Sequence, residues 1–548
     1  MSADHTAAVG PYFARKATGL VRELSAFHSL VFNASFINVG LILIYMFLFV
    51  PSFHPGSSMW IACAVGTLAA VFMALANAML ATTFPRSGGE YVYNSRAIAP
   101  FVGFATNFNI TIWLLFYVGV SCVLFPKYGL TAVFRFVGVR YGNPGLLGVA
   151  NWLATPTGMF IIGSAALLIV ITGLVFSTRR VARIQSWYFV IGLIGIAVAV
   201  AVLMAETKQT YIGRFDSYFG TLAATNGTMA ATLAGARQNG FESGGFSLLA
   251  TMVVFFWPAS FLFWGNASTY FGGEVRDAKR SQLFGLLGAV VLAGVLLVLV
   301  VLAFQRTVGA DSLGAIGYLN AIGKGFGFAP TYAELAAIGT SSTFLGLVIL
   351  LACTYWTVAF VPLCVGACTR NLLAWSLDRV APEALSSVSP RFHTPVPALL
   401  VCGFIGWIAV ALHSYVPAFA FMVGTFGAFL TFMTTAVSAI LLPFRRPRIF
   451  ADSPMNRRVG RLPVMSLVGV LALIGTVAIQ VSLLSDKYSG ISLFRSTDAG
   501  TGPGVPFKML LVNLGILASG FVLYAVAKLV RRAQGVDVTL AFKEIPPE

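Results

Sequence analysis

Long apolar stretches separated by shorter polar segments recur along the chain between residues 27 and 530. A helix needs about 20 consecutive apolar residues to cross roughly 30 Å of hydrocarbon, and most of these stretches reach that length. The pattern therefore predicts an all-α membrane protein with 12 transmembrane helices. The predicted spans are 27–50, 59–83, 98–124, 157–176, 184–204, 246–270, 283–304, 343–368, 397–412, 417–442, 464–484 and 507–530.

The composition excludes an ordinary soluble protein. Hydrophobic residues make up 58% of the 548 and charged residues 10%, whereas soluble domains have about half apolar and about a quarter charged residues. So few charges cannot cover the surface of a water-soluble core, so lipid must surround much of the chain. Because the twelve stretches take up most of the length, we interpret the chain as one membrane domain.

The basic residues fall unevenly on the two sides of these spans. Of the 35 Lys and Arg residues, 24 lie on the side that carries both chain ends and 11 on the opposite side. Basic residues favour the cytoplasmic side, so we expect cytoplasmic N- and C-termini in a multi-pass protein of the plasma (cell) membrane. The net charge of +17 sits in loops beside the spans. We therefore expect the lipid bilayer as a partner, and no nucleic acid.

The predicted organisation follows from these spans. It comprises a cytoplasmic N-terminus (1–26), a first five-helix repeat (27–204), an extracellular loop (205–245), a second five-helix repeat (246–442), helices 11 and 12 with a preceding basic loop (443–530) and a cytoplasmic tail (531–548). The polar N-terminus shows no pattern of a cleaved signal peptide. All six cysteines lie inside the apolar stretches, so we expect no disulfide framework, no metal site and no cofactor.

Two predicted spans carry polar or helix-breaking residues at membrane depth. The first contains Asn33, Ser35, Asn38 and Gly40, and the sixth contains Pro258 among aromatic residues. Proline lacks the backbone N–H and clashes with the preceding turn, so we expect the sixth helix to kink or break there. Irregular backbone inside a bilayer is tolerated only where protein or a water-filled cavity satisfies it.

Interrupted helices at corresponding positions of two repeats point to a transporter's binding site. The first and sixth spans are five spans apart, as corresponding helices are in a five-plus-five inverted repeat. Because of the polar and proline interruptions, we predict that Asn33–Gly40 and Trp257–Ser260 are non-helical and face each other near mid-membrane. The exposed amides of such broken helices attract a carboxylate, and their free carbonyls attract a cation. The alternative is that these polar groups only join helices. The candidate substrate-binding residues are Asn33, Ser35, Asn38, Val39 and Gly40 in the first span, and Phe256, Trp257, Pro258, Ala259 and Ser260 in the sixth.

The polar segment between the second and third spans, Phe84–Arg96, contains paired glycines followed by two tyrosines. Paired glycines allow a tight turn, and tyrosines anchor at a membrane boundary. This segment resembles the P-x-x-G-G-x-Y-x-Y signature of the amino acid–polyamine–organocation (APC) superfamily. Three later segments resemble that superfamily's loops after the sixth and eighth spans and its entry into the ninth: Gly272–Arg280, Thr369–Pro382 and Arg391–Pro397.

The resemblance covers roughly residues 20–450 and implies an amino acid permease with the leucine-transporter-type fold. In that fold a central site lies between the broken helices 1 and 6 and helices 3, 8 and 10, and a proton (H+) or sodium (Na+) gradient drives alternating access. The superfamily's glycine-rich break falls near Asn38–Leu41. The fifth span lacks the lysine of some proton-coupled relatives, and Thr354 and Thr357 are a partial match to the hydroxyls of a sodium (ion-binding) site.

The spans carry no Asp or Glu, although a cationic substrate would need an acid at that depth. We therefore predict a secondary active transporter, a symporter of neutral, zwitterionic amino acids. A carrier of another small neutral solute such as a purine, and a non-transporting substrate sensor on the same fold, are the alternatives.

An enzyme would need convergent His, Asp, Glu or Cys in the spans and a channel would show charged rings, so we expect neither. The sequence predicts no particular protein partner.

Two finer hypotheses concern gating. We expect one of Phe255, Phe256 and Trp257 to close over the substrate as an aromatic gate, unless these rings serve only in packing. We also expect Arg22 to pair with Asp378 or a nearby acid when the carrier faces outward. The alternative is that these charges are interfacial anchors.

Overall fold

A computed structural model describes residues 20–222, 227–416, 419, 424–489, 491 and 505–542. Twelve helical segments within them are long and apolar enough to cross a membrane, which confirms the all-α fold and the predicted number of spans. They are Ala26–Phe53, Met59–Thr83, Pro100–Arg140, Pro156–Phe176, Thr178–Ala205, Leu248–Tyr270, Ala278–Thr307, Thr343–Leu377, Val396–Tyr415, Thr425–Arg445, Val464–Ser485 and Lys508–Ala533. In the predicted tenth span, 417–418 and 420–423 lie outside the described residues.

Several spans consist of more than one helix. The spanning helices are α1 (Ala26–Ile37), α2 (Val39–Phe53), α3 (Met59–Thr83), α5 (Pro100–Leu124), α8 (Pro156–Phe176), α9 (Thr178–Ala205), α12 (Leu248–Val254), α13 (Phe256–Leu262), α14 (Ala267–Tyr270), α15 (Ala278–Thr307), α18 (Thr343–Val358), α19 (Val361–Leu377), α20 (Val396–Tyr415), α22 (Thr425–Arg445), α24 (Val464–Ser485) and α25 (Val505–Ala533). The connecting elements are α4 (Glu90–Ala97), the π-helical η1 (Phe125–Leu130), α6 (Thr131–Arg140), α7 (Pro144–Leu153), α10 (Lys208–Gly220), α11 (Met229–Gln238), η2 (Gly272–Glu274), α16 (Ala310–Ala321), α17 (Tyr332–Ala337), η3 (Glu383–Ser386), α23 (Pro447–Ala451), the antiparallel strands β1 (Arg458–Val459) and β2 (Leu462–Pro463), and η4 (Val538–Phe542).

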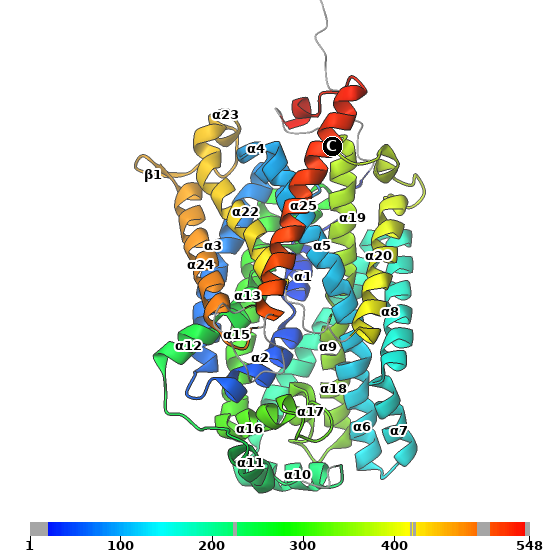
Figure 1. The fold of residues 1–548 in the computed structure, drawn as a ribbon, viewed down its shortest axis with the longest axis vertical. Helices are drawn as coiled ribbons and strands as arrows, with labels where there is room; N and C mark the ends of the chain where they lie inside the picture. The colour runs from blue at the N-terminus through cyan, green and yellow to red at the C-terminus, as the bar shows by residue number, and fades with distance from the viewer. Residues whose placement is uncertain are drawn as a thin grey trace, which may run out of the picture.

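The spanning helices run side by side along the long axis, and their connections gather at its two ends (Figure 1). α4, α23 and the C-terminal end of the chain lie at one end, which we name the terminal side. α6, α7, α10, α11, α16 and α17 lie at the opposite end, which we name the loop side.

The first, third, sixth and eighth spans form the centre of the bundle. In their most apolar windows 78%, 72%, 61% and 61% of the residues are buried, against 22% in the fourth span and 17% in the twelfth. A helix this apolar with so little buried surface faces lipid. A central site is therefore built mainly from the first, third, sixth and eighth spans.

The third span is longer than the hydropathy pattern predicts. It continues from α5 through η1 into α6, so residues 125–140, which were expected in a loop, are helical. Pro126 lies at the start of η1 and cannot donate a backbone hydrogen bond. The wider π-helical turn thus falls where the α-helical pattern is interrupted.

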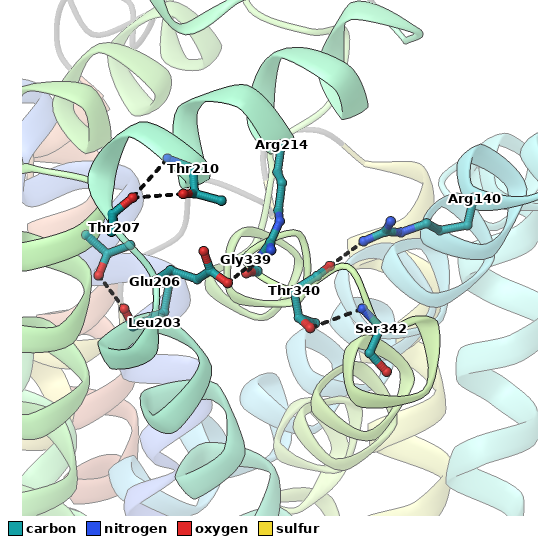
Figure 2. Close-up of polar contacts among 10 residues, drawn as sticks. Arg140, Leu203, Glu206, Thr207, Thr210, Arg214, Gly339, Thr340 and Ser342 are labelled. Carbon is teal, nitrogen blue, oxygen red and sulfur yellow. Dashed lines mark hydrogen bonds and ion pairs between the residues drawn. The ribbon is translucent and has the colours of Figure 1, made fainter.

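Short helices fill the long connections on the loop side, and two arginines fix one of these connections. Arg140, at the end of α6, donates to the Thr340 carbonyl, and Arg214 of α10 donates to the Gly339 carbonyl and to the Glu206 carboxylate (Figure 2). The segment between α17 and α18 is thereby tied to two other helices. Hydropathy could not reveal such helices, because they are too short and polar to span a membrane.

The last described residues fold back onto the terminal side. Phe542 of η4 is 2% exposed, and its ring packs edge-on against Tyr91 with 6.2 Å between ring centroids. The Arg96 guanidinium lies over the same ring and donates to the Ala541 carbonyl at 3.2 Å. η4 is therefore docked on α4.

Candidate functional site

The first span is interrupted at one residue, Asn38. Its φ of 59° and ψ of 72° place it in the left-handed region between α1 and α2, a conformation that Asn tolerates better than other non-glycine residues. The Asn38 Oδ1 accepts a hydrogen bond from the Leu41 amide at 3.1 Å and so caps α2. The predicted irregular stretch Asn33–Gly40 is wrong at every residue but Asn38, because the other polar side chains bind neighbouring helices without breaking their own.

The sixth span is interrupted twice. Phe255 separates α12 from α13, and Pro258 follows in the first turn of α13. Proline is tolerated in a first turn because the amides there have no partner within the helix. Trp257–Ser260 is consequently helical, and the prediction of a non-helical stretch there is wrong. The longer interruption is Phe263–Asn266, between α13 and α14.

The two interrupted spans border a small cavity of about 30 Å³. Its walls come from the first, third, sixth and eighth spans and from the start of α22 in the tenth. The lining residues are Phe36, Asn38, Leu41, Tyr117, Ser121, Ser260, Phe261, Trp264, Phe360 and Thr425.

This cavity combines aromatic rings with uncharged polar groups. Phe36 and Phe360 stack with 4.6 Å between centroids, and Trp264 stands edge-on to them at 5.8 and 6.1 Å. The Asn38 Nδ2 and the Ser121 Oγ are buried without a hydrogen-bond partner among the described residues. Since buried polar groups are normally paired, both atoms can serve a ligand. The residues described as lining the cavity include no charged side chain.

Asn33 and Ser35 join helices and do not line this cavity. The Asn33 Nδ2 donates to the Ser268 Oγ of α14 at 3.0 Å, and its Oδ1 accepts from the Ser268 amide at 2.8 Å. The Ser35 hydroxyl lies 3.0 Å from the Tyr355 hydroxyl of α18, which also accepts from Gln185 of α9 at 2.9 Å. These bonds attach α1 to the sixth, eighth and fifth spans, as the alternative interpretation of the polar residues expected.

Val39 and Gly40 begin α2 beside the cavity, where both are buried. A Cβ atom on Gly40 would lie 2.3 Å from the Trp356 Cβ of α18. Glycine is required here because it lets the two helices approach this closely.

Among the sixth-span candidates, Ser260 lines the cavity. Ala259 is buried against α3, where a Cβ on Gly66 would lie 3.1 Å from it. Pro258 is also buried. Phe256 packs against Trp257 with 4.8 Å between ring centroids. These residues support the cavity wall from behind.

Trp257 belongs to a set of stacked rings between the cavity and the loop side, which we name the aromatic column. Three α2 rings spaced four residues apart stack on one another and on rings of other segments. The Phe49 and Trp257 rings are nearly parallel, with 5.0 Å between centroids and 7° between planes. The column consists of Tyr45, Phe49 and Phe53 of α2 with Phe261, Trp257 and Tyr488.

Thr354 and Thr357 line a different, smaller space of about 10 Å³ shared with η1, α2 and α17. Both hydroxyls donate at 2.7 Å to carbonyls of their own helix. Gly129 of η1 packs against them, since a Cβ there would lie 2.8 Å from Thr354. The two threonines therefore contact the third span.

The terminal side of the cavity is closed by rings and buried charges. Arg370 of α19 is fully buried and holds both Glu274 carboxylate oxygens, at 2.9 and 3.1 Å. Its guanidinium lies over the Phe271 ring at 4.6 Å, and Phe271 packs edge-on against Phe32 of α1 at 5.2 Å. The first, sixth and eighth spans are thus joined at this side.

Backbone contacts complete this closure. The amides of Glu23 and Leu24 both donate to the Glu274 carbonyl at 2.9 Å. Asp378 lies 3.5 Å from Arg96. The structure shows the ion pairs Arg370–Glu274, Arg96–Asp378 and Arg179–Glu23 on this side. The pairing of Arg22 with Asp378 or a nearby acid stays a prediction.

Comparison with known proteins gives one family. Residues 30–513 match the model of a family described as amino acid permease. A comparison with curated proteins found no match.

Proposed function

Because the chain belongs to the amino acid permease family, we propose that it carries a neutral, zwitterionic amino acid across the plasma membrane by alternating access. The observation that carries the proposal is the uncharged, aromatic cavity between the interruptions of the first and sixth spans. An ion in such a cavity would lack a counter-charge, which is costly. A zwitterion brings charges that cancel and that helix ends can bind.

The carboxylate of the substrate would lie at the start of α2. Free amides and the dipole of a helix N-terminus favour negative charge, and Asn38 adds an unpaired Nδ2 donor at the same point. The ammonium group would face the carbonyls exposed where α1 and α13 end, since the last turn of a helix leaves its carbonyls unpaired.

The side chain of the substrate would lie among the rings of Phe36, Trp264 and Phe360. Such walls bind apolar and aromatic groups by burial and edge-on contacts, at about 0.5–1.5 kcal/mol for an aromatic pair beyond the area term. Leucine- and phenylalanine-like substrates are therefore favoured over small polar ones. A planar purine would also stack here, and it is the second candidate.

Two sets of contacts would close the cavity in turn. The aromatic column lies toward the loop side, and the Phe32–Phe271–Arg370–Glu274 cluster lies toward the terminal side. Opening one set while the other stays closed is alternating access. We infer that residues 27–204 and 246–442 form the inverted repeat, that both termini are cytoplasmic, and that a proton or sodium gradient drives the cycle.

Counterflow in reconstituted vesicles tests this function. Vesicles loaded with unlabelled leucine should take up radiolabelled leucine or phenylalanine, and vesicles without the protein should not. Ser121→Ala removes one unpaired cavity hydroxyl and should weaken apparent affinity, whereas the lipid-facing Leu168→Ala should not. Uptake of a labelled purine alone would favour the second candidate. Binding without counterflow would indicate a sensor.

A further inference from the structure

Five acidic side chains are buried in the described part of the chain: Glu90, Glu274, Glu334, Asp378 and Asp486. Four of them lie within 4 Å of a basic side chain. Glu274 pairs with Arg370, Glu334 with Arg135, Asp378 with Arg96, and Asp486 with His54. Glu90 is the exception, because no ion pair to it occurs among the described residues.

Glu90 is instead held by neutral donors. Its Oε1 accepts from the Asn107 Nδ2 of α5 at 2.9 Å and from the Tyr270 hydroxyl of α14 at 3.2 Å. Its Oε2 is buried without a partner, and the side chain is 2% exposed. A carboxyl group in such a place is far cheaper to bury neutral than ionised.

The titratable groups that face Glu90 carry no charge near neutral pH. They are Tyr93 on its own helix α4, Tyr270 on α14 and Cys368 on α19. α5 presents the amide of Asn107, whose Oδ1 accepts from the Trp375 indole at 2.7 Å. Burial therefore dominates and raises the pKa of Glu90 to about 7.

Glu90 is also connected to the cavity and to the closure of the terminal side. The Tyr270 ring packs against Phe36, a cavity residue, with 6.3 Å between centroids. The Tyr270 carbonyl accepts from the Gly88 amide at 3.0 Å, which attaches α14 to the turn before α4. α14 itself is four residues long and lies between the Phe263–Asn266 interruption and η2. Displacement of α14 would remove the cover of Glu90 and admit water.

We propose that Glu90 is a proton-binding site of the transport cycle and that the proton is the coupling ion. While α14 covers Glu90 from the terminal side, its carboxylate takes a proton from a hydronium ion that enters through the cavity from the loop side, which leaves a water molecule. The carboxyl O–H breaks when the terminal side opens, and the proton passes to water there. This inference rests on the proposed function and identifies its ion. It is independent of Thr354 and Thr357.

The direction of the pH effect follows from linkage. The covered carboxyl group has a pKa of about 7, and an exposed one has the ordinary value of 4.5. The covered state therefore binds the proton more tightly, and it loses stability relative to the open state as pH rises through this interval. Full exposure would change the open-to-covered ratio by on the order of a hundredfold across the interval.

Gradient-driven uptake into vesicles of the full chain tests the proposal. With radiolabelled leucine, the native protein should accumulate substrate under a pH gradient without sodium, and an internal pH dye should report proton entry. Glu90→Gln should keep counterflow within about threefold of native and lose both responses. Glu90→Asp should restore them, and Glu23→Gln, a half-exposed acid on the same side, should behave as native.

The outcomes separate the two proposals. Accumulation under a pH gradient by Glu90→Gln, or accumulation by the native protein under a sodium gradient alone, would overturn the proton site while leaving the transporter intact. Absence of native counterflow for every amino acid would overturn the proposed function. In either that case or the case that Glu90→Gln does not fold, infrared titration of the protein decides whether Glu90 binds a proton. A protonated-carboxyl band that disappears near neutral pH, and that is shifted in Glu90→Asp, supports the site. Absence of this band from the native protein rejects the site.

Discussion

The interruptions in the first and sixth spans differ in how they are made. The first is a single residue, Asn38, whose own side chain caps the next helix. The sixth span has a long interruption at Phe263–Asn266 and a one-residue interruption at Phe255. The helix after the long interruption, α14, is only four residues long. A helix pair joined by one capped residue has little freedom, whereas a longer break next to a short helix has more hinge positions.

This difference separates two roles within one cavity. The first span supplies the precisely oriented groups, the α2 amides and the Asn38 Nδ2. The sixth supplies the Trp264 ring and α14, the segment that the proposed cycle displaces, which carries Tyr270 over Glu90. Substitutions in the first interruption should therefore act on binding and folding together. Those in the sixth should act mainly on affinity or on exchange between states.

Asn38→Ala should have the largest effect. Alanine in the left-handed region costs about 1–2 kcal/mol, and loss of the cap costs about 1 kcal/mol more. The free energy of unfolding should therefore fall by about 2–3 kcal/mol. Counterflow should also fall, because the substrate carboxylate loses the Asn38 Nδ2 donor. Asn38→Gly, which keeps the conformation and loses only the amide, is the control and should be thermally more stable than Asn38→Ala. Equal stability of the two variants would show that the conformation of Asn38 is not the cause.

Gly40→Ala should come next, through stability. Its Cβ would lie 2.3 Å from the Trp356 Cβ, an atom fixed to the backbone of α18, and such overpacking costs about 1–3 kcal/mol. The matched control is Gly265→Ala in the sixth interruption, where the nearest atoms are the Ile37 and Val290 side-chain ends at 3.1 Å. Thermal unfolding in detergent should rank Gly40→Ala below Gly265→Ala, and the reverse order would contradict the comparison.

Trp264→Ala should act on affinity. Removing the cavity ring forfeits burial and edge-on contacts worth about 1–2 kcal/mol, so the half-saturation concentration for phenylalanine should rise roughly tenfold. Trp257→Ala is the control for an aromatic that lies outside the cavity, in the aromatic column. Trp257→Ala should change the counterflow rate more than the affinity. If it lost as much affinity as Trp264→Ala, the cavity wall and the aromatic column could not be assigned separate roles in binding and gating.

Pro258→Ala should have the smallest effect. The proline lies in the first turn of α13, where its missing N–H has no partner to lose. We expect a change in thermal stability equivalent to less than about 1 kcal/mol and counterflow close to native. A large loss of transport would mean that the interruption at Phe255 is needed for transport, and not the one at Phe263–Asn266.

The fold could be predicted from the sequence because hydropathy and span length are set by the membrane itself. The break at Asn38 was marked by a residue that tolerates the left-handed region. Pro258 marked the shorter interruption of the sixth span at Phe255, within one turn before the proline. The turn-forming Gly265 and Asn266 lie in the longer interruption. Phe36, Tyr117, Ser121, Phe360 and Thr425 could not be identified as cavity residues, because spacing within a span does not show which face meets another helix.

The docked η4 also has a consequence for how the chain is made. Arg96 and the Ala541 carbonyl that it binds are 445 residues apart. At about 5–20 residues per second, translation would need roughly 20 to 90 seconds to reach the second partner after the first. Throughout that time the surface of α4 around Tyr91 lacks the ring of Phe542, which covers it in the finished protein. The terminal side is thus completed only after all twelve spans have been synthesised.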